Sequence, residues 1–125
     1  MILGIGVDSI EISRVVKAME KEHFVHRIFT EKEWAEMEHA KRRGASDFAG
    51  KEAVVKALGT GFAAGIDACD VEILRRESGA PYVTLYGAAK KKAEEIGITD
   101  WKISITNTKE VATAFVIAVA DDVKE

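Results

Sequence analysis

The sequence predicts an α+β protein formed by a single domain over residues 1–125. Segments with apolar residues at helical spacing alternate along the chain with short apolar runs typical of strands, and neither kind dominates. The length of 125 residues is common for one domain, and the chain contains no linker, repeat or low-complexity segment. The composition, with 47% hydrophobic and 31% charged residues, is typical of a globular protein rather than a disordered one.

The N-terminal segment predicts a strand followed directly by a helix. Residues 2–7, ILGIGV, form a short apolar run that predicts a buried strand ending at Asp8. Apolar residues at positions 12, 15, 16 and 19 then follow the spacing of a helix. Asp8 or Ser9 is the expected N-cap of this helix, and Glu11 follows Asp8 at the spacing of a capping box.

The remaining elements follow the same two patterns. A second helix is expected over TEKEWAEMEHAKR with Thr30 as its cap, and a third over FAGKEAVVKALGTGF, residues 48–62, ended by its glycines. Two strands with a turn between them come next, then a helix closed by Gly97, and then two last strands. We expect these elements at residues 70–76, 81–86, 87–97, 101–105 and 110–120.

Composition and charge limit the classes of function. The formal net charge of −3 gives no electrostatic reason to expect nucleic-acid binding. No apolar run is long enough to span a membrane, and the N-terminus lacks the basic region and cleavage site of a signal peptide. The single cysteine, Cys69, excludes an internal disulfide and suits a reducing compartment. These features predict a soluble cytoplasmic protein.

The helix expected over residues 48–62 carries charges that its apolar sequence does not explain. Lys51, Glu52 and Lys56 are the only charged residues between Phe48 and Ile66. A helix that is apolar nearly all round is normally buried, and a buried charge needs a partner, a metal or a polar site. These three residues are therefore candidate site residues.

Asp8 and Glu52 are the two carboxylates that suggest a metal site. Asp8 follows a buried strand, and two hard carboxylates without a nearby imidazole or thiolate suit Mg²⁺, which also binds substrate phosphates. Lys51 and Lys56 flank Glu52 and would supply cations for such phosphates. The alternative is an internal Glu52–Lys56 pair at i, i+4 spacing, with Asp8 a simple helix cap. The residues alone leave both interpretations open.

Other familiar motifs are incomplete. GIGVDS lacks the third glycine of a dinucleotide fingerprint, and His23 and His26 have no further ligands to complete a zinc site, so two solvated histidines are expected. Cys69 has no histidine close to it in sequence and reads as a small buried side chain. Nucleophilic catalysis by the protein is poorly supported.

Two longer motifs resemble those of a known family. GIGVDSIEISR is similar to the N-terminal motif of holo-acyl-carrier-protein synthases, and FAGKEAVVKALGTG is similar to their second motif. The resemblance continues through GAPYV to ISITNTKEVATAFV and so covers the whole chain. It implies the 4′-phosphopantetheinyl transferase fold, in which a small antiparallel sheet packs against helices, with one domain per chain.

The resemblance also implies an activity and its residues. Enzymes of this superfamily transfer the phosphopantetheine arm of coenzyme A to a serine of an apo acyl carrier protein and release 3′,5′-ADP. In the family, residues matching Asp8 and Glu52 hold Mg²⁺ against the pyrophosphate of coenzyme A. The implied catalytic residues are Asp8, Glu52 and Lys56, the implied coenzyme A contacts are Lys51, Lys56, Gly59 and Pro81, and Arg14 docks the acidic carrier protein.

Four positions depart from the commonest family pattern. A basic residue often stands where this chain has Asp47, a lysine where it has Ala80, and histidines where it has Lys102 and Asn107. These changes fall at the contacts that the family makes to the adenine and the 3′-phosphate of coenzyme A. They leave both carboxylates and both lysines of the second motif in place.

Two other classes of function remain open at this point. One is a catalytically weak or inactive homologue that binds coenzyme A or a carrier protein, and the other is a structural oligomer with an internal Glu52–Lys56 pair. The apolar run VATAFVIAVA, residues 111–120, predicts an oligomer, because a strand apolar on both faces needs cover on both. The family resemblance specifies a homotrimer with each coenzyme A site at a subunit boundary.

Overall fold

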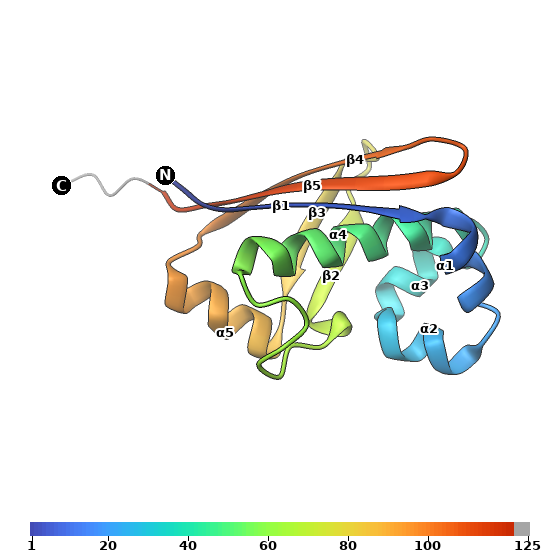
Figure 1. Ribbon diagram of the computed structural model, residues 1–125, viewed down its shortest axis with the longest axis horizontal. Coiled ribbons are helices and arrows are strands. Elements are labelled where there is room, and N and C mark those ends of the chain that lie inside the picture. Colours follow the sequence, from blue (N-terminus) through green and yellow to red (C-terminus); the bar gives the residue numbers. More distant parts are fainter. Residues whose placement is uncertain (122–125) are drawn as a thin grey trace.

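The computed structural model describes residues 1–121. A three-stranded antiparallel sheet forms one layer, and the helices lie together on one side of it (Figure 1). A two-stranded sheet lies on the same side as the helices (Figure 1). This mixed arrangement of helices and antiparallel strands confirms the predicted α+β class.

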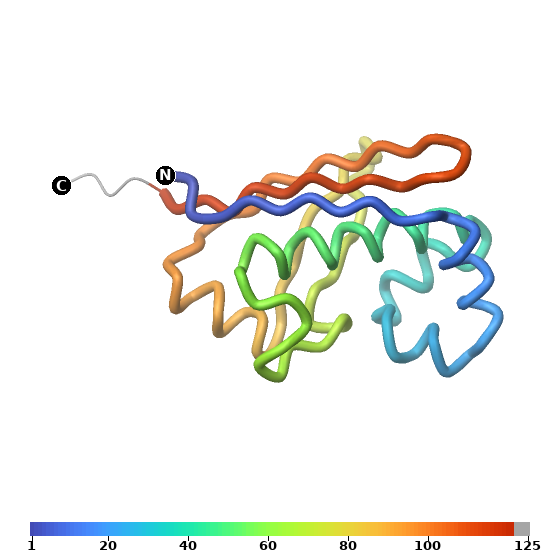
Figure 2. The backbone as a smooth tube through the Cα atoms, in the orientation of Figure 1, coloured from blue at the N-terminus to red at the C-terminus, as the bar shows by residue number. Residues whose placement is uncertain are grey.

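The three-stranded sheet joins the two ends of the chain. Strand β5 (Val111–Val119) is its centre, flanked by β1 (Ile2–Glu11) and β4 (Asp100–Asn107). The first and last strands run side by side for most of their length (Figure 2), and Asp8 pairs with Ala114. The fold therefore places the N-terminal motif on an edge strand of this sheet.

Helix α4 (Arg42–Leu58) fills the space directly beneath the sheet. The inward side chains of β5 are small and fully buried, with Ala112, Ala114, Val116 and Ala118 facing the helices. Strand β1 comes closer still, because a side chain at Gly6 would lie only 1.9 Å from the carbonyl oxygen of Ala53. The glycines of GIGVDS are thus explained by the close approach of β1 to α4, and not by a nucleotide.

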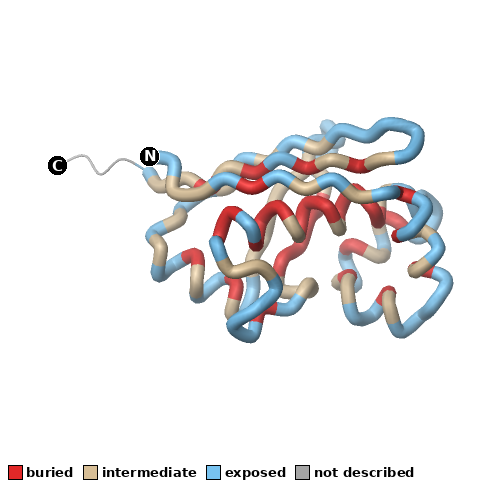
Figure 3. The backbone as a smooth tube through the Cα atoms, viewed as in Figure 1, coloured by how far each residue is buried: buried red, intermediate tan, exposed pale blue. Residues whose placement is uncertain are grey.

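The buried residues form two clusters along α4 (Figure 3). Three short helices lie at one end: α1 (Ile12–Ala18), α2 (Glu22–Ile28) and α3 (Glu31–Met37). Helix α5 (Gly87–Ile96) lies toward the other end (Figure 1). A short 3₁₀ turn η1 (Ala68–Asp70) leads into the second sheet, formed by β2 (Val71–Arg75) and β3 (Pro81–Leu85).

Several local predictions are confirmed. Thr30 caps α3 in a complete capping box, in which its hydroxyl accepts from the Glu33 N–H and Glu33 accepts from the Thr30 N–H. Gly97 closes α5 in the left-handed conformation, and Gly59 ends α4 in the same way. The strands of the second sheet fall within one residue of their expected positions.

Other predictions at the N-terminal end are wrong. Neither Asp8 nor Ser9 caps α1, because β1 continues through both residues to Glu11 and pairs with β5 throughout. The Ser9 hydroxyl instead lies 2.8 Å from the hydroxyl of Thr113 on β5. Helix α4 begins at Arg42, well before the expected start at Phe48, and α2 was not predicted at all. Asp8 is therefore a strand residue and free of any capping role.

The outer face of the three-stranded sheet has no helix against it (Figure 1). Large apolar side chains exposed on this face include Ile5 (61% exposed), Val7 (56%) and Phe115 (37%). The register places Val7 opposite Phe115 and Ile5 opposite Ile117. Strand β5 thus has apolar residues on both faces, as expected, with one face on the core and the other directed outward. Within residues 1–121, none of the helices has the length and apolar character needed to cross a membrane.

Candidate active site

Asp8 and Lys56 meet where β1 crosses α4. The Lys56 ammonium donates to Asp8 Oδ1 at 3.1 Å and to the main-chain oxygen of Val7 at 3.0 Å. Half of the Lys56 side chain is exposed, whereas that of Asp8 is largely covered. An ammonium has three donors, so the third N–H of Lys56 is available to a ligand in solvent.

Glu52 joins this pair from the preceding turn of α4. Burial raises the pKa of its carboxyl group above the ordinary value, the negative charge of Asp8 raises it further, and Lys56 opposes both. The effect of Asp8 on the pKa of Glu52 indicates that these two negative charges oppose each other. Within the described part of the chain, the ion pair of Lys56 is with Asp8 and not with Glu52, so the internal i, i+4 pair is not formed.

The donor set at this place suits a hard divalent cation. It offers two carboxylates whose mutual repulsion a cation would relieve, with an exposed ammonium beside them. Mg²⁺ binds in just such surroundings, keeping several waters and sharing the phosphates of a substrate. The residues present therefore fit the expected magnesium site.

Lys51 does not join this site, contrary to the expectation. Its side chain is fully buried, and its ammonium donates to Glu33 Oε1 at 2.7 Å and to the main-chain oxygens of Ala68 and Val71 at 2.9 and 2.5 Å. All three donors of the ammonium are then used inside the protein. The structure therefore does not support a phosphate contact for Lys51, which instead ties α4 to α3 and β2.

The other expected contact residues fall in three places. Gly59 follows Lys56 at the end of α4, close in sequence to the carboxylate site. Pro81 begins β3 and lines a separate pocket at the other end of α4. Arg14 is exposed on α1. The expected coenzyme A contacts are thus divided between two regions of the chain.

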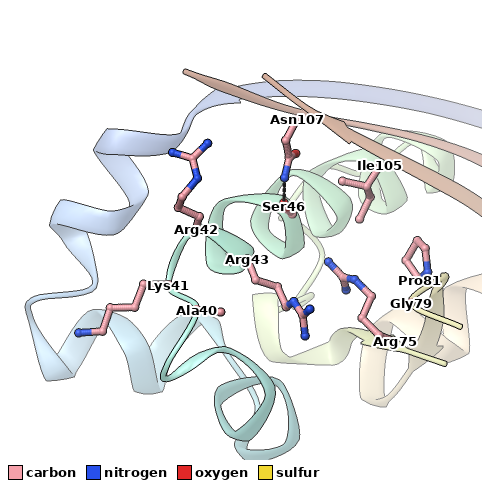
Figure 4. A pocket seen from close by; sticks show the side chains of 10 residues that line it. All are labelled: Ala40, Lys41, Arg42, Arg43, Ser46, Arg75, Gly79, Pro81, Ile105 and Asn107. Atoms are coloured by element: carbon pink, nitrogen blue, oxygen red, sulfur yellow. Dashed lines mark hydrogen bonds between the residues drawn. The ribbon is translucent and has the colours of Figure 1, made fainter. Parts of the chain in front are cut away.

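The pocket that Pro81 lines is strongly basic (Figure 4). Its volume is about 530 Å³, and the segment at the start of α4 supplies Lys41, Arg42 and Arg43 to its wall. A fourth cation, Arg75, comes from the end of β2. We call this the basic pocket, and its remaining lining residues are Ala40, Ser46, Gly79, Ile105 and Asn107. Four cations around one cavity make it a place for an anion.

Internal contacts fix the walls of the basic pocket. Arg42 donates to the main-chain oxygens of Thr108 and Lys109, at 3.1 and 3.0 Å, and so ties the start of α4 to the turn after β4. Asn107 donates to the Ser46 hydroxyl at 2.7 Å. Sequence reasoning did not single out this cluster. The run Lys41–Arg42–Arg43 just before the second motif was a visible signal, but the contribution of Arg75 was not.

The remaining chemically active side chains lie apart from both regions. His23 and His26 are exposed on α2, and His26 Nε2 lies 3.4 Å from Glu22 Oε1. Cys69 is partly buried, and its burial raises the pKa of the thiol above its ordinary value. A thiol with a raised pKa is a poor nucleophile near neutral pH.

Comparisons with known proteins agree on one family. Residues 4–119 match the model of the 4′-phosphopantetheinyl transferase superfamily. The holo-[acyl-carrier-protein] synthase of Lachnoclostridium phytofermentans is 51% identical over 117 residues, which are 94% of this chain and 95% of that protein. The solved holo-[acyl-carrier-protein] synthase of Neisseria meningitidis is 31% identical and superposes with a TM-score of 0.86, covering 95% of this chain and 99% of that one.

A further solved structure is a complex with a ligand. It is a holo-(acyl-carrier-protein) synthase from Bacillus anthracis in complex with coenzyme A (3′,5′-ADP). That chain is 30% identical to this one with a TM-score of 0.81, and the match covers 97% of this chain and 99% of that one. Together with the predicted motifs and the observed fold, these matches show that the chain is an enzyme of the holo-[acyl-carrier-protein] synthase family within the 4′-phosphopantetheinyl transferase superfamily.

Proposed function

We propose that this chain transfers the 4′-phosphopantetheine group of coenzyme A to a serine of an apo acyl carrier protein, in a reaction that requires Mg²⁺. The observation that carries the proposal is the contact of Lys56 with Asp8, from motifs far apart in sequence, with Glu52 one helical turn before Lys56 on α4. The coenzyme A complex of the Bacillus anthracis relative supports the choice of substrate.

The reaction is a displacement at phosphorus. The serine oxygen forms a bond to the phosphorus that carries the pantetheine arm, and the bond from that phosphorus to the bridging oxygen breaks. The leaving group is 3′,5′-ADP, and the serine proton passes to a base at the site. The protein forms no covalent bond in this scheme, so positioning and charge neutralisation provide most of the catalysis.

Each residue of the carboxylate site has a part in this scheme. Asp8 and Glu52 would hold Mg²⁺, which when bound draws negative charge from the pyrophosphate. Lys56 is anchored by two hydrogen bonds and directs its remaining N–H to the oxygens on which charge develops. Lys51 contributes through its hydrogen bond to Glu33, which fixes α4 against α3, and does not contact the substrate.

The carrier protein is expected to dock on the N-terminal helices. Arg14 and Lys17 are exposed on α1, and Lys21 and Arg27 are exposed nearby. Acyl carrier proteins are acidic, so this basic surface suits them electrostatically. Arg14 follows β1 within the first motif, which brings the docked serine toward Asp8.

We also propose that the active form is a cytoplasmic homotrimer in which each coenzyme A site lies at a subunit boundary. The uncovered apolar face with Ile5, Val7 and Phe115 supports an oligomer. The division of the expected coenzyme A contacts supports shared sites, because the basic pocket and the carboxylate site are lined by different residues. A neighbouring subunit would bring the basic pocket of one copy to the carboxylates of another.

Mass spectrometry of an apo acyl carrier protein tests the activity. After incubation with the enzyme, coenzyme A and Mg²⁺, the carrier protein should gain the mass of one phosphopantetheine. Omission of Mg²⁺, or replacement of the acceptor serine by alanine, should remove that gain. A carrier protein that stays unmodified while the enzyme still binds coenzyme A would instead indicate a binding homologue without catalytic activity.

A further inference from the structure

A buried ion pair lies at the wall of the basic pocket, and three of its polar atoms have no hydrogen-bond partner among the described residues. Arg75 Nη1 lies 2.8 Å from Asp47 Oδ1, and the side chains are 12% and 0% exposed. The contact is poorly aligned, so neither oxygen of Asp47 nor Nη1 of Arg75 has a hydrogen-bond partner among the described residues. The attraction of the charges holds the guanidinium beside Asp47.

Arg75 stands between this buried carboxylate and the open pocket. It ends β2 opposite Pro81 of β3, and both residues line the pocket wall. Figure 4 shows the guanidinium groups of Arg75 and Arg43 extending into the same space. Arg43 makes a long hydrogen bond, from Nη1 to the main-chain oxygen of Glu36 at 3.5 Å. Arg75 is therefore the cation of this pocket that a buried acid holds in place.

The charges assign a ligand group to Arg75. Coenzyme A has two anionic parts, the diphosphate and the 3′-phosphate. The carboxylate site with Lys56 suits the diphosphate, which leaves the 3′-phosphate for the basic pocket. A carboxylate at position 47 would repel that phosphate unless a cation shielded it, and Arg75 lies where it can do so.

We propose that Arg75, positioned by Asp47, binds the 3′-phosphate of coenzyme A in this chain. Arg75 thus supplies from β2 the positive charge that position 47 itself lacks. The proposal rests on the proposed function, since it assumes coenzyme A as the substrate. Asp47 has two opposed effects on the phosphate: it holds Arg75 in place, and its own negative charge repels the phosphate.

The protonation of Asp47 gives this arrangement a measurable signature. Burial raises the pKa of Asp47 to about 7, while Arg75 from β2 and Lys51 from α4 lower it and Glu33 from α3 raises it. An anion bound to Arg75 would raise this pKa further, so binding near pH 7 takes up a proton. Affinity for the 3′-phosphate should then fall between pH 7 and pH 9, a range in which the phosphate itself is already ionised.

Calorimetric titration with two nucleotides tests the role of Arg75. Arg75→Met should weaken binding of 3′,5′-ADP by about 10- to 100-fold, the usual effect of losing a charged hydrogen bond. Binding of 5′-ADP, which lacks the 3′-phosphate, should change far less, and Arg75→Lys should recover part of the loss. The matched control is Arg76→Met, because the Arg76 guanidinium lies 4.8 Å from the Tyr82 ring and outside the pocket lining.

The Asp47→Asn variant tests the electrostatic coupling between the buried carboxylate and the bound phosphate. Its affinity for 3′,5′-ADP should no longer fall between pH 7 and pH 9, whereas the unmodified enzyme should show the fall. If Arg75→Met does not fold because Asp47 has lost its partner, the double variant Asp47→Asn/Arg75→Met removes both charges and takes its place. Circular dichroism confirms folding for every variant.

The outcomes separate this inference from the proposed function. If Arg75→Met weakens both nucleotides equally, or if the pH dependence persists in Asp47→Asn, the inference is overturned while the transferase assignment stands. If the unmodified enzyme binds 3′,5′-ADP through Arg75 but modifies no carrier protein, the proposed function fails while the assignment of Arg75 stands. An enzyme that transfers the arm normally and shows no 3′-phosphate preference contradicts the inference alone.

Discussion

Two lysines of the same motif have opposite surroundings. Lys51 is fully buried and bound on three sides within the protein, whereas Lys56 is half exposed and bound to Asp8 and Val7. Both lie on α4, but one faces α3 and β2 and the other faces the edge strand β1. The face of the helix, rather than the residue type, thus decides which lysine is used inside the protein and which is available to the proposed site.

The first prediction concerns Lys51. Lys51→Met should lower the free energy of unfolding by about 3–5 kcal/mol, because it leaves Glu33 buried without its cation. Burial already raises the pKa of Glu33 despite Lys51, so without Lys51 that carboxyl should be protonated at still higher pH. Urea denaturation measures the loss. Lys56→Met is the matched control, and it should cost about 1 kcal/mol or less. Equal losses in the two variants would contradict the structural role of Lys51.

The second prediction concerns Glu52. Glu52→Gln should reduce the transfer rate by about 100-fold or more, because it removes one of the two carboxylates for the cation. Asp8→Asn should act in the same direction. Glu94→Gln, on the exposed part of α5, serves as the control. Full activity of Glu52→Gln or Asp8→Asn would exclude the proposed magnesium site.

Glu52→Gln should also change the stability of the protein, because the pKa of Glu52 is raised in the folded state. A carboxyl whose pKa is higher in the folded state costs stability when it ionises, so stability falls as the pH rises from 4.5 through the raised pKa. In metal-free buffer at pH 7, Glu52→Gln should therefore melt slightly above the unmodified enzyme. Its melting temperature should depend less on pH over that acidic range. A lower melting temperature would indicate that Glu52 has a structural rather than a catalytic role.

At the scale of elements, the contact between β1 and α4 builds the site. The third prediction is that Gly6→Ala separates them, because its Cβ would lie 1.9 Å from the carbonyl oxygen of Ala53, where nothing flexible can yield. We expect a loss of about 1–3 kcal/mol of stability. We also expect a lower transfer rate at saturating substrates, because Asp8 moves with the strand. Fluorescence melting and steady-state kinetics measure the two effects, and a variant with unchanged activity would contradict this account.

The fourth prediction concerns docking on α1. Arg14→Glu should raise the KM for carrier protein much more than the KM for coenzyme A, because it reverses a charge on the surface expected to meet an acidic partner. Added salt should likewise raise the KM of the unmodified enzyme for carrier protein more than its KM for coenzyme A. Lys91→Glu on α5, at the other end of the molecule (Figure 1), is the matched control. An unchanged KM for carrier protein in Arg14→Glu would exclude this docking surface.

Local sequence predicted the elements whose signals are local. The capping box at Thr30 and the terminal glycine at Gly97 are formed within a few residues of chain, and both were read correctly. The capping pattern at Asp8 misled, because pairing with β5 about a hundred residues away extends the strand through it. Helix α2 has no side-chain cap at Lys21, and so lacks the signal by which Thr30 marks the start of α3.

The candidate site also has a part that local sequence predicts and a part that depends on long-range contacts. The motifs named Asp8, Glu52 and Lys56, and the structure brings them together. The sequence could not show that Glu33, on a different helix, is the partner of Lys51. Nor could it show that Arg75 from β2 reaches Asp47, because both contacts depend on how elements distant in sequence pack. Long-range pairing of charges is the information that only the fold supplies.

At the scale of the whole molecule, the outer face of the main sheet remains without a covering layer in the single chain (Figure 3). Helices cover only the inner face, and Ile5, Val7 and Phe115 are exposed on the other. Antiparallel sheets with one solvated face normally carry polar residues there. On β4 this face is polar, with Lys102 beside Ile117 and Ser104 beside Phe115. Its apolar part, on β1 and β5, supports the proposed contact with other copies of this chain.

The fifth prediction tests the proposed coupling of assembly and activity. Phe115→Glu places a charge at the centre of the outer face, opposite Val7, and burying that charge between subunits is costly. The variant should sediment as a smaller species than the unmodified enzyme, for which we expect a trimer at micromolar concentration. Its transferase activity should fall with the loss of the assembly, since each site needs a neighbour. Lys90→Glu on α5 controls for the added negative charge and should remain assembled and active. A Phe115→Glu monomer with full activity would show that one chain suffices, and would overturn both the trimer and the shared site.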